Sequence, residues 1–119
     1  MPTASGHTRA ILASKVHGTK VLNTKGEKIG HVEDIVLDKQ TNNIMFAVLG
    51  FGGFLGIGEK YHPVPWSVLD YDKDMSGYVV SLSKDTLEKA PAYELSALTN
   101  DDGKARDSSY SYYKVAPYW

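Results

Sequence analysis

One stretch of the chain, Ile44–Phe51, is apolar at consecutive positions and constrains the fold more than any other stretch. Side chains of a strand point alternately to opposite faces, so a strand on a half-solvated sheet alternates apolar and polar residues. A strand that is apolar on both parities is therefore covered on both faces. In a chain of 119 residues, one face can look into a small barrel. The opposite face then needs a helix, a tail or a second subunit as its cover.

Short β-prone runs separated by turn residues lie on both sides of this stretch. They are Lys20–Leu22, Lys28–Asp38, Glu59–Trp66, Val68–Tyr71 and Tyr78–Leu82. The apolar parity switches within the second run, and a β-bulge near Glu33 and Asp34 accounts for the switch. Pro63 and Pro65 remove two backbone donors on one side of their run, which suits a strand edge or an irregular crossing. With Gly26 at a tight turn, the pattern predicts a mainly β fold, a small and strongly bent β-barrel of about six strands.

After the last strand the apolar period becomes that of a helix. Ser83 is predicted to cap a short helix that runs through Ala90, and Pro91 ends it. The segments that follow are predicted to be another helical turn at Tyr93–Leu98, a polar linker at Asn100–Ser109 and an aromatic tail at Tyr110–Trp119. The predicted organisation is a flexible N-terminal arm over residues 1–11, a barrel domain over 12–91 and a C-terminal extension over 92–119.

Composition argues against several classes of partner and of chemistry. Thirteen Lys and Arg oppose fourteen Asp and Glu, for a net charge of -1, so no basic surplus exists to bind a phosphate backbone and we expect no nucleic-acid partner. The absence of cysteine excludes disulfides, a thiol nucleophile and a Cys-ligated metal. The apolar runs are too short for a secretory signal or a membrane span. We expect a cytoplasmic protein without membrane insertion, although a signal removed earlier would leave no trace here.

Three motifs resemble ligand sites but have the wrong spacing or context. Gly50–Gly58 lacks the third glycine of a dinucleotide fingerprint and the Gly-Lys step of a phosphate loop, and no helix is expected to follow it. Asp70–Asp74 is followed by Met75, where a calcium loop needs glycine. His31 and Glu33 share a strand face, but an ordinary surface pair is favoured over a metal-ligand or acid–base pair. We therefore predict no catalytic residue, no cofactor and no metal site.

The aromatic tail is the most unusual feature, since it holds half of the eight tyrosines and one of the two tryptophans. Such rings either cover the chain's own barrel or dock on another protein. Both alternatives stay open, with a slight preference for a homodimer, because a small barrel has little surface of its own for so many rings. The predicted interaction surface comprises Phe51, Phe54, Leu55, Ile57, Tyr110, Tyr112, Tyr113, Tyr118 and Trp119. Separately, Trp66 is predicted to be a mostly buried anchor of the barrel.

Four segments, Ala13–Val21, Gly26–Asp38, Gly50–Lys60 and Pro63–Ser67, together resemble the PRC-barrel family over roughly residues 12–91. The turn at residues 26–30 and the glycine-rich block at 53–60 are specific in combination. The family takes its name from the cytoplasmic domain of the photosynthetic reaction-centre H subunit and includes the C-terminal domain of RimM. The resemblance implies a small, strongly bent β-barrel that binds proteins and carries no catalytic residues, here in a free-standing bacterial form with an aromatic extension.

These observations predict a non-enzymatic protein-interaction or assembly module with an unidentified protein partner. The alternative is a small-ligand or metal-binding barrel protein, because small barrels can hold a ligand at their mouths.

Overall fold

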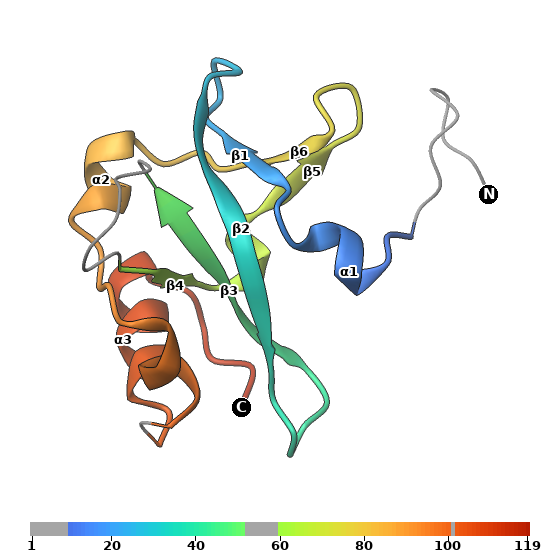
Figure 1. Ribbon diagram of the computed structural model, residues 1–119. Coiled ribbons are helices and arrows are strands. Elements are labelled where there is room, and N and C mark those ends of the chain that lie inside the picture. The colour runs from blue at the N-terminus through green and yellow to red at the C-terminus, as the bar shows by residue number, and fades with distance from the viewer. Residues whose placement is uncertain (1–9, 52–59, 101) are drawn as a thin grey trace.

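The computed structural model describes residues 10–51, 60–100 and 102–119, which form a bent β-sheet flanked by short helices (Figure 1). In chain order the elements are α1 (Ala13–Val16), β1 (Lys20–Leu22), β2 (Lys28–Leu37), β3 (Ile44–Phe51), β4 (His62–Val64), the 3-10 helix η1 (Trp66–Val68), β5 (Asp70–Asp72), β6 (Gly77–Val79), α2 (Lys84–Glu88), the 3-10 helix η2 (Leu95–Thr99) and α3 (Lys104–Tyr113). The predicted runs overlap the strands, and β1 and β3 have the predicted bounds. The glycines at 52–58 and most of the predicted N-terminal arm lie outside the described residues.

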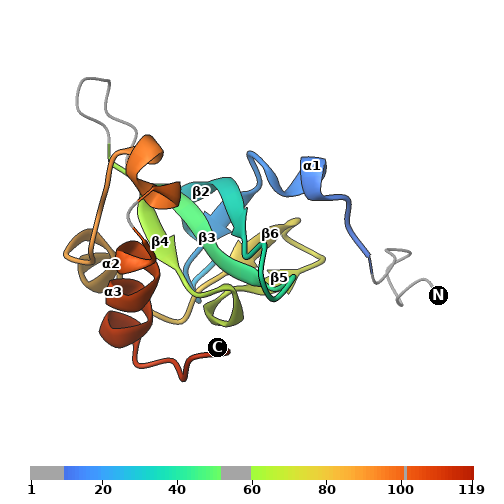
Figure 2. The same cartoon turned by 90° about the horizontal axis from the view of Figure 1, so that it is seen from below.

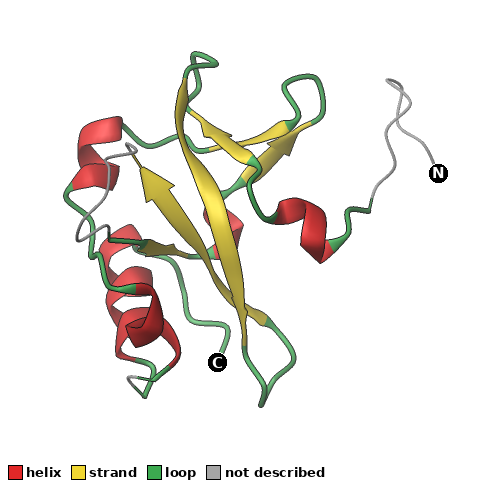
Figure 3. Ribbon diagram, in the orientation of Figure 1, coloured by secondary structure: helices red, strands yellow, loops and turns green. Residues whose placement is uncertain are grey.

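The six strands of the described ranges form one mixed sheet in the order β4-β3-β2-β1-β6-β5 (Figure 3). β1 pairs with β6 in parallel, and the other neighbouring pairs are antiparallel. Within these ranges β4 and β5 are the edges and do not pair with each other, so the sheet is open. The mainly β fold and the number of strands are therefore confirmed, whereas closure of the barrel is not.

The predicted bulge lies in β2. Val32 is the partner of Leu49 and Asp34 is the partner of Val48, so Glu33 is the extra residue. A bulge bends its strand and shifts the side-chain alternation by one position. This explains why Val32 and Ile35, which differ in parity, both pack in the same core cluster.

Apolar residues of β3 pack on both faces of the sheet, as its sequence predicted. Ala47 and Leu49 belong to the main core cluster, which draws its other members largely from β1, β2, β6 and α2. Phe46 and Val48 belong to a second cluster on the other face, which includes Leu98 of η2 and a residue of α3. All four of these β3 side chains are fully buried. The second cover is thus made by helices of the same chain, which lie beside β3 and β4 (Figure 2).

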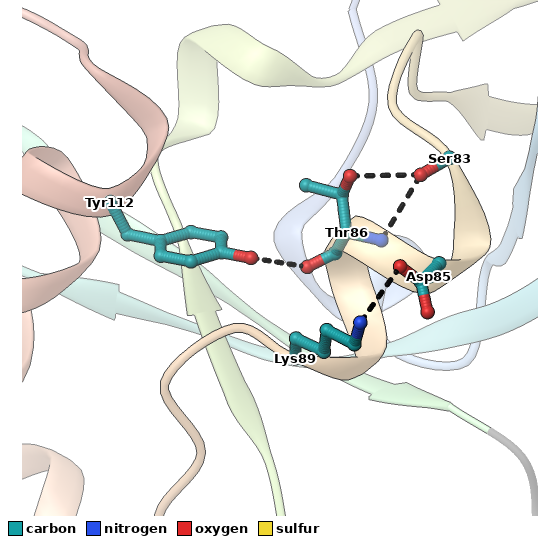
Figure 4. A network of polar contacts seen from close by, with 5 residues as sticks. All are labelled: Ser83, Asp85, Thr86, Lys89 and Tyr112. Atoms are coloured by element: carbon teal, nitrogen blue, oxygen red, sulfur yellow. Dashed lines mark hydrogen bonds and ion pairs between the residues drawn. The ribbon is translucent and has the colours of Figure 1, made fainter.

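The short helix after the last strand has the predicted cap (Figure 4). The backbone N–H of Thr86 donates a hydrogen bond to Oγ of Ser83 over 3.0 Å, which satisfies a donor that the first turn of a helix leaves free. Asp85 and Lys89 form an exposed ion pair one turn apart, with 3.3 Å between Nζ and Oδ2. The helix ends at Glu88, before Pro91. The predicted helical turn at Tyr93–Leu98 corresponds to η2.

The predicted polar linker is wrong in its second half, because α3 begins at Lys104. Ala105 and Ser109 on this helix are fully buried, so contacts with the sheet stabilise a segment that looks like a linker in sequence. Trp66, in contrast, agrees with its prediction, because most of its side chain is buried against the main core cluster. It begins η1, and its ring contacts the Tyr78 ring edge-on with the centroids 5.3 Å apart.

Replacing Phe46 with alanine should therefore destabilise the protein more than replacing Trp66. Phe46 is fully buried in the second core cluster, and deleting such a ring leaves a cavity that costs about 3–5 kcal/mol. Trp66→Ala should lower the free energy of unfolding by about 1–3 kcal/mol, because Trp66 is not fully buried and the space it leaves is partly open to water. Chemical denaturation of both variants gives the two values. A larger loss for Trp66→Ala would contradict the two-layer core.

Candidate interaction surface

The aromatic residues of the C-terminal extension lie on two elements. Tyr110, Tyr112 and Tyr113 belong to α3, whereas Tyr118 and Trp119 belong to the segment that follows it. The helix ends where Lys114 adopts a left-handed conformation, with φ of 57°. This turns the chain, and the last residues run back toward the β2–β3 hairpin (Figure 1).

Three of these tyrosines donate hydrogen bonds from their hydroxyls to distant parts of the same chain. Tyr110 bonds to the carbonyl of Met45 in β3 at 2.8 Å. Tyr112 bonds to the carbonyl of Thr86 in α2 at 2.7 Å (Figure 4). Tyr118 bonds to Oδ2 of Asp38 in the β2–β3 turn at 2.6 Å. Of the two arrangements left open by the sequence, the structure therefore shows the extension docked on its own chain.

Arg106 packs against the aromatic cluster formed by Tyr110, Tyr118 and Trp119. Its guanidinium carbon is 3.9 Å from the centroid of the Trp119 ring, within the range of a cation–π contact. The Trp119 ring in turn packs edge-on against Tyr110 and Tyr118, with centroids 4.8 and 5.0 Å apart. Arg106 also forms an ion pair with Asp107 at 3.1 Å. The cluster joins the end of the chain to α3.

The contact between Tyr118 and Asp38 shifts the pKa of both groups. The hydrogen bond from Tyr118 lowers the pKa of Asp38 most, and the backbone amides of Gln40 and Thr41 lower it further. Burial, together with the hydrogen bond to the Asp38 carboxylate, raises the pKa of Tyr118 to about 12. Asp38 is thus held as a carboxylate and Tyr118 as a neutral phenol, the pairing that an O–H donor and an ionised acceptor require.

Among the predicted interaction residues that the structure describes, Phe51 and Tyr113 pack against the same core cluster, whereas Tyr110 contacts an earlier part of β3. Phe51 ends β3 and packs against the His62 ring, with centroids 5.0 Å apart. Met45, which accepts the Tyr110 bond, lies six positions earlier in the same strand, roughly 20 Å away at the usual rise per residue. The remaining candidates, Phe54, Leu55 and Ile57, lie outside the described residues.

His31 and Glu33 do form the predicted surface pair. Nε2 of His31 is 3.2 Å from Oε1 of Glu33, and 37% and 27% of the two side chains are exposed. The imidazole also lies over Gly50, where an added Cβ would come within 2.7 Å of the ring. Within the described ranges no group of three His, Asp or Glu could hold a metal ion. The arrangement supports a packing role for His31.

Two buried polar atoms of the described residues have no hydrogen-bond partner, namely Nδ1 of His62 and the hydroxyl of Tyr113. Burial lowers the pKa of His62, against the opposing effect of the Pro91 and Ala90 carbonyls. Burial likewise raises the pKa of the Tyr113 phenol. Both groups are therefore held neutral at physiological pH. The sequence predicted Tyr113 as part of the interaction surface, whereas it gave no role to His62, which has no chemical partner nearby in the chain.

A groove of about 1060 Å³ lies between the β2–β3 hairpin and the segment from η2 to the start of α3. Its walls include Asp34, Ile35, Val36, Leu37, Asp38, Lys39, Gln40, Met45, Phe46, Val48, Leu95, Leu98, Thr99, Asn100, Asp102, Gly103 and Arg106. Leu37 and Leu95 on these walls are 61% and 44% exposed. Sequence reasoning missed this groove, because its two walls come from segments about sixty residues apart.

The open, bent sheet with its helical second layer defines a small, mainly β domain. Comparison with protein-family models matches residues 9–87 to the PRC-barrel domain, which is more than half of the chain. The chain therefore belongs to the PRC-barrel family, as its sequence resemblance predicted. A search of curated proteins finds no match. Among the described helices, none has both the length and the apolar character needed to cross a bilayer.

Removing the Tyr118 hydroxyl should weaken the docking of the tail in a pH-dependent way. The pKa of Tyr118 is higher in the folded chain than the ordinary value of 10.0, so its contribution to stability is complete below pH 10 and is lost toward pH 12. The pKa of Asp38 is lowered, so its contribution is present above its ordinary pKa and is lost as pH falls through the folded value. Tyr118→Phe should lower Tm by roughly 2–5 °C at neutral pH. It should also reduce the loss of stability at high pH and the loss at low pH.

Thermal unfolding between pH 2 and pH 11.5, followed by circular dichroism, measures these effects. Tyr71→Phe is the control, because Tyr71 lies on β5 and is 45% exposed. Among the described residues, no contact joins it to the tail. Equal pH profiles for Tyr118→Phe and the wild type would contradict the docked tail.

Proposed function

We propose that this chain is a non-enzymatic protein-interaction module that binds a segment of a partner protein in the groove beside β2. The observation that carries the proposal is the pair of exposed leucines, Leu37 and Leu95, on the walls of that groove. Exposed apolar side chains gathered in a concave surface are typical of protein-interaction sites. Membership of a family that the sequence resemblance associates with protein binding supports the same function.

The shape and polarity of the groove also favour a protein partner. Apolar side chains such as Leu37 and Met45 line it, while Asp34, Lys39 and Asp102 provide charged groups. An apolar centre with a polar rim is the usual anatomy of a protein interface. Since the tail is docked on its own chain, we place the partner at this groove and not at the tail rings.

The arrangement of reactive side chains supports a role without catalysis. His31 and Glu33 form a solvent-accessible pair over a glycine, and no nucleophile or third polar group accompanies them among the described contacts. The buried His62 packs against an aromatic ring. An acid–base or nucleophilic site needs groups that act together at hydrogen-bond distance around a space for substrate.

Leu37→Glu should abolish partner binding without unfolding the protein. The substitution places a charge at an exposed position in the groove, where desolvating it on binding costs affinity. The matched control is Met75→Glu, because Met75 is 37% exposed in the turn between β5 and β6, away from the groove. Circular dichroism should show that both variants melt within a few degrees of the wild type.

Affinity enrichment from the host, quantified by mass spectrometry, provides the test. We expect at least one protein to be enriched by the wild type and Met75→Glu and to fall at least tenfold with Leu37→Glu. Its purified form should reproduce that order in calorimetry. Identical enrichment by all three proteins would contradict the proposal. So would a metabolite or metal ion that raises the Tm of the wild type but not of Leu37→Glu, since the groove would then be a small-ligand site.

A further inference from the structure

We infer that Asp34–Leu37 of β2 is an open strand edge that accepts an extended, basic segment of the partner as an added strand. The inference rests on the proposed function and names the mode of binding and the chemistry of the partner. It depends on three features of the described residues: an unpaired backbone edge, a carboxylate that caps it, and the charge of the groove.

The edge is open because β2 is much longer than its neighbour β1. β1 pairs with β2 only between Lys28 and His31. Two further backbone bonds join Val32 to Thr19 and Gly18. Beyond the bulge, Asp34–Leu37 pairs with β3 on one side, and no other described segment pairs with its opposite side. Four residues of strand extend over roughly 13 Å, enough to pair with a short peptide.

The edge strand β4 shows what a protected edge looks like in this protein. β4 contains Pro63, which has no N–H to offer, and the Pro63 carbonyl accepts a hydrogen bond from Ser109 of α3 at 2.6 Å. Next to it, Tyr61 and Tyr93 exchange two backbone hydrogen bonds of 2.8 and 2.9 Å. Helix and loop thus cover the edge of β4, whereas no described segment pairs with the free side of Asp34–Leu37.

Asp34 caps the open edge in the free protein. Its Oδ1 accepts a hydrogen bond of 2.8 Å from the backbone N–H of Ile35, and its side chain is exposed. A backbone carbonyl of an added strand can take over this N–H, because strand addition supplies acceptors along the edge. The displaced carboxylate then needs a new partner. A Lys or Arg on the added strand provides one, so every hydrogen bond lost is replaced.

The charges around the groove favour the same partner. Its walls carry the carboxylates of Asp34, Asp38 and Asp102, against Lys39 and Arg106. Arg106 is already paired with Asp107 and stacked on Trp119, and no ion pair joins Asp34 or Asp102 to another described residue. The available charge is therefore mainly negative, which attracts a basic segment.

The alternation of β2 also predicts the pattern of the partner. Val36 packs with the second core cluster, on the side of η2 and α3, and Asp34 is two residues before it on the same face. Cross-strand neighbours on one face are likewise two residues apart. The added strand should thus place a basic side chain beside Asp34 and an apolar one beside Val36, separated by one residue.

Blocked seven-residue peptides provide the probe, titrated into the ¹⁵N-labelled full chain. One peptide contains a lysine and a valine separated by one residue, with threonine at the positions between and around them. Its matched control has glutamate in place of the lysine. We expect the lysine peptide to bind at least tenfold more tightly, to shift the amide resonances of Asp34–Leu37 and to slow hydrogen exchange of the Ile35 N–H. Alternate backbone N–H groups of an added strand point toward β2 and away from it. N-methylation of the set that faces β2 should therefore abolish binding, whereas N-methylation of the other set should not.

Asp34→Asn should weaken the lysine peptide roughly twofold to fivefold, as loss of an exposed charge pair does, while an amide oxygen can still cap Ile35. Asp74→Asn, an equal charge change in the β5–β6 turn, should have no effect. Equal binding of all N-methylated peptides, equal binding of the glutamate peptide, or the absence of shifts at Asp34–Leu37 would each overturn the inference. If these occur while Leu37→Glu still loses its host partner, the interaction function stands and only the strand-addition mode is wrong.

Discussion

The burial of β3 on both faces is the constraint from which the rest of the structure follows. The bent sheet supplies one cover, around Ala47 and Leu49. The other must come from outside the sheet, and η2 and α3 provide it over Phe46 and Val48. α3 is held there through the bond from Ser109 to the Pro63 carbonyl. The C-terminal extension is thus part of the core, although it lies beyond residues 9–87 that match the family domain.

Features that depend on neighbouring residues could be predicted from the sequence. The bounds of β3, the bulge at Glu33, the positive φ of Gly26 and the cap at Ser83 each follow from alternation or turn chemistry within a few positions. Whether a sheet closes depends instead on whether its two edge strands meet, and these are distant in the chain. Local patterns carry no information on that pairing, so strand number was predictable and closure was not.

α3 shows why the second layer was harder to predict. Its sequence from Lys104 to Tyr113 is rich in serine and tyrosine, which are mediocre helix formers, and no side chain caps its start at Gly103. Short isolated helices of this kind are marginal in water. The helix gains its stability from tertiary contacts, chiefly the buried Ala105 and Ser109. The candidate groove was missed for the same reason, since it exists only once α3 and η2 lie beside the β2–β3 hairpin.

The open edge of β2 raises the question of why two copies of the chain would not pair there. Strand edges that expose free backbone groups are prone to self-association, and charges placed on the edge oppose it. In an antiparallel two-fold pairing centred on Ile35, each strand would displace the Asp34 cap of the other and place its own Val36 beside that carboxylate, where a cation is needed. Both carboxylates would lose the N–H that they accept in the free chain. The same side chain therefore disfavours a copy of this protein and favours a basic segment, so one exposed aspartate can provide both protection and selectivity.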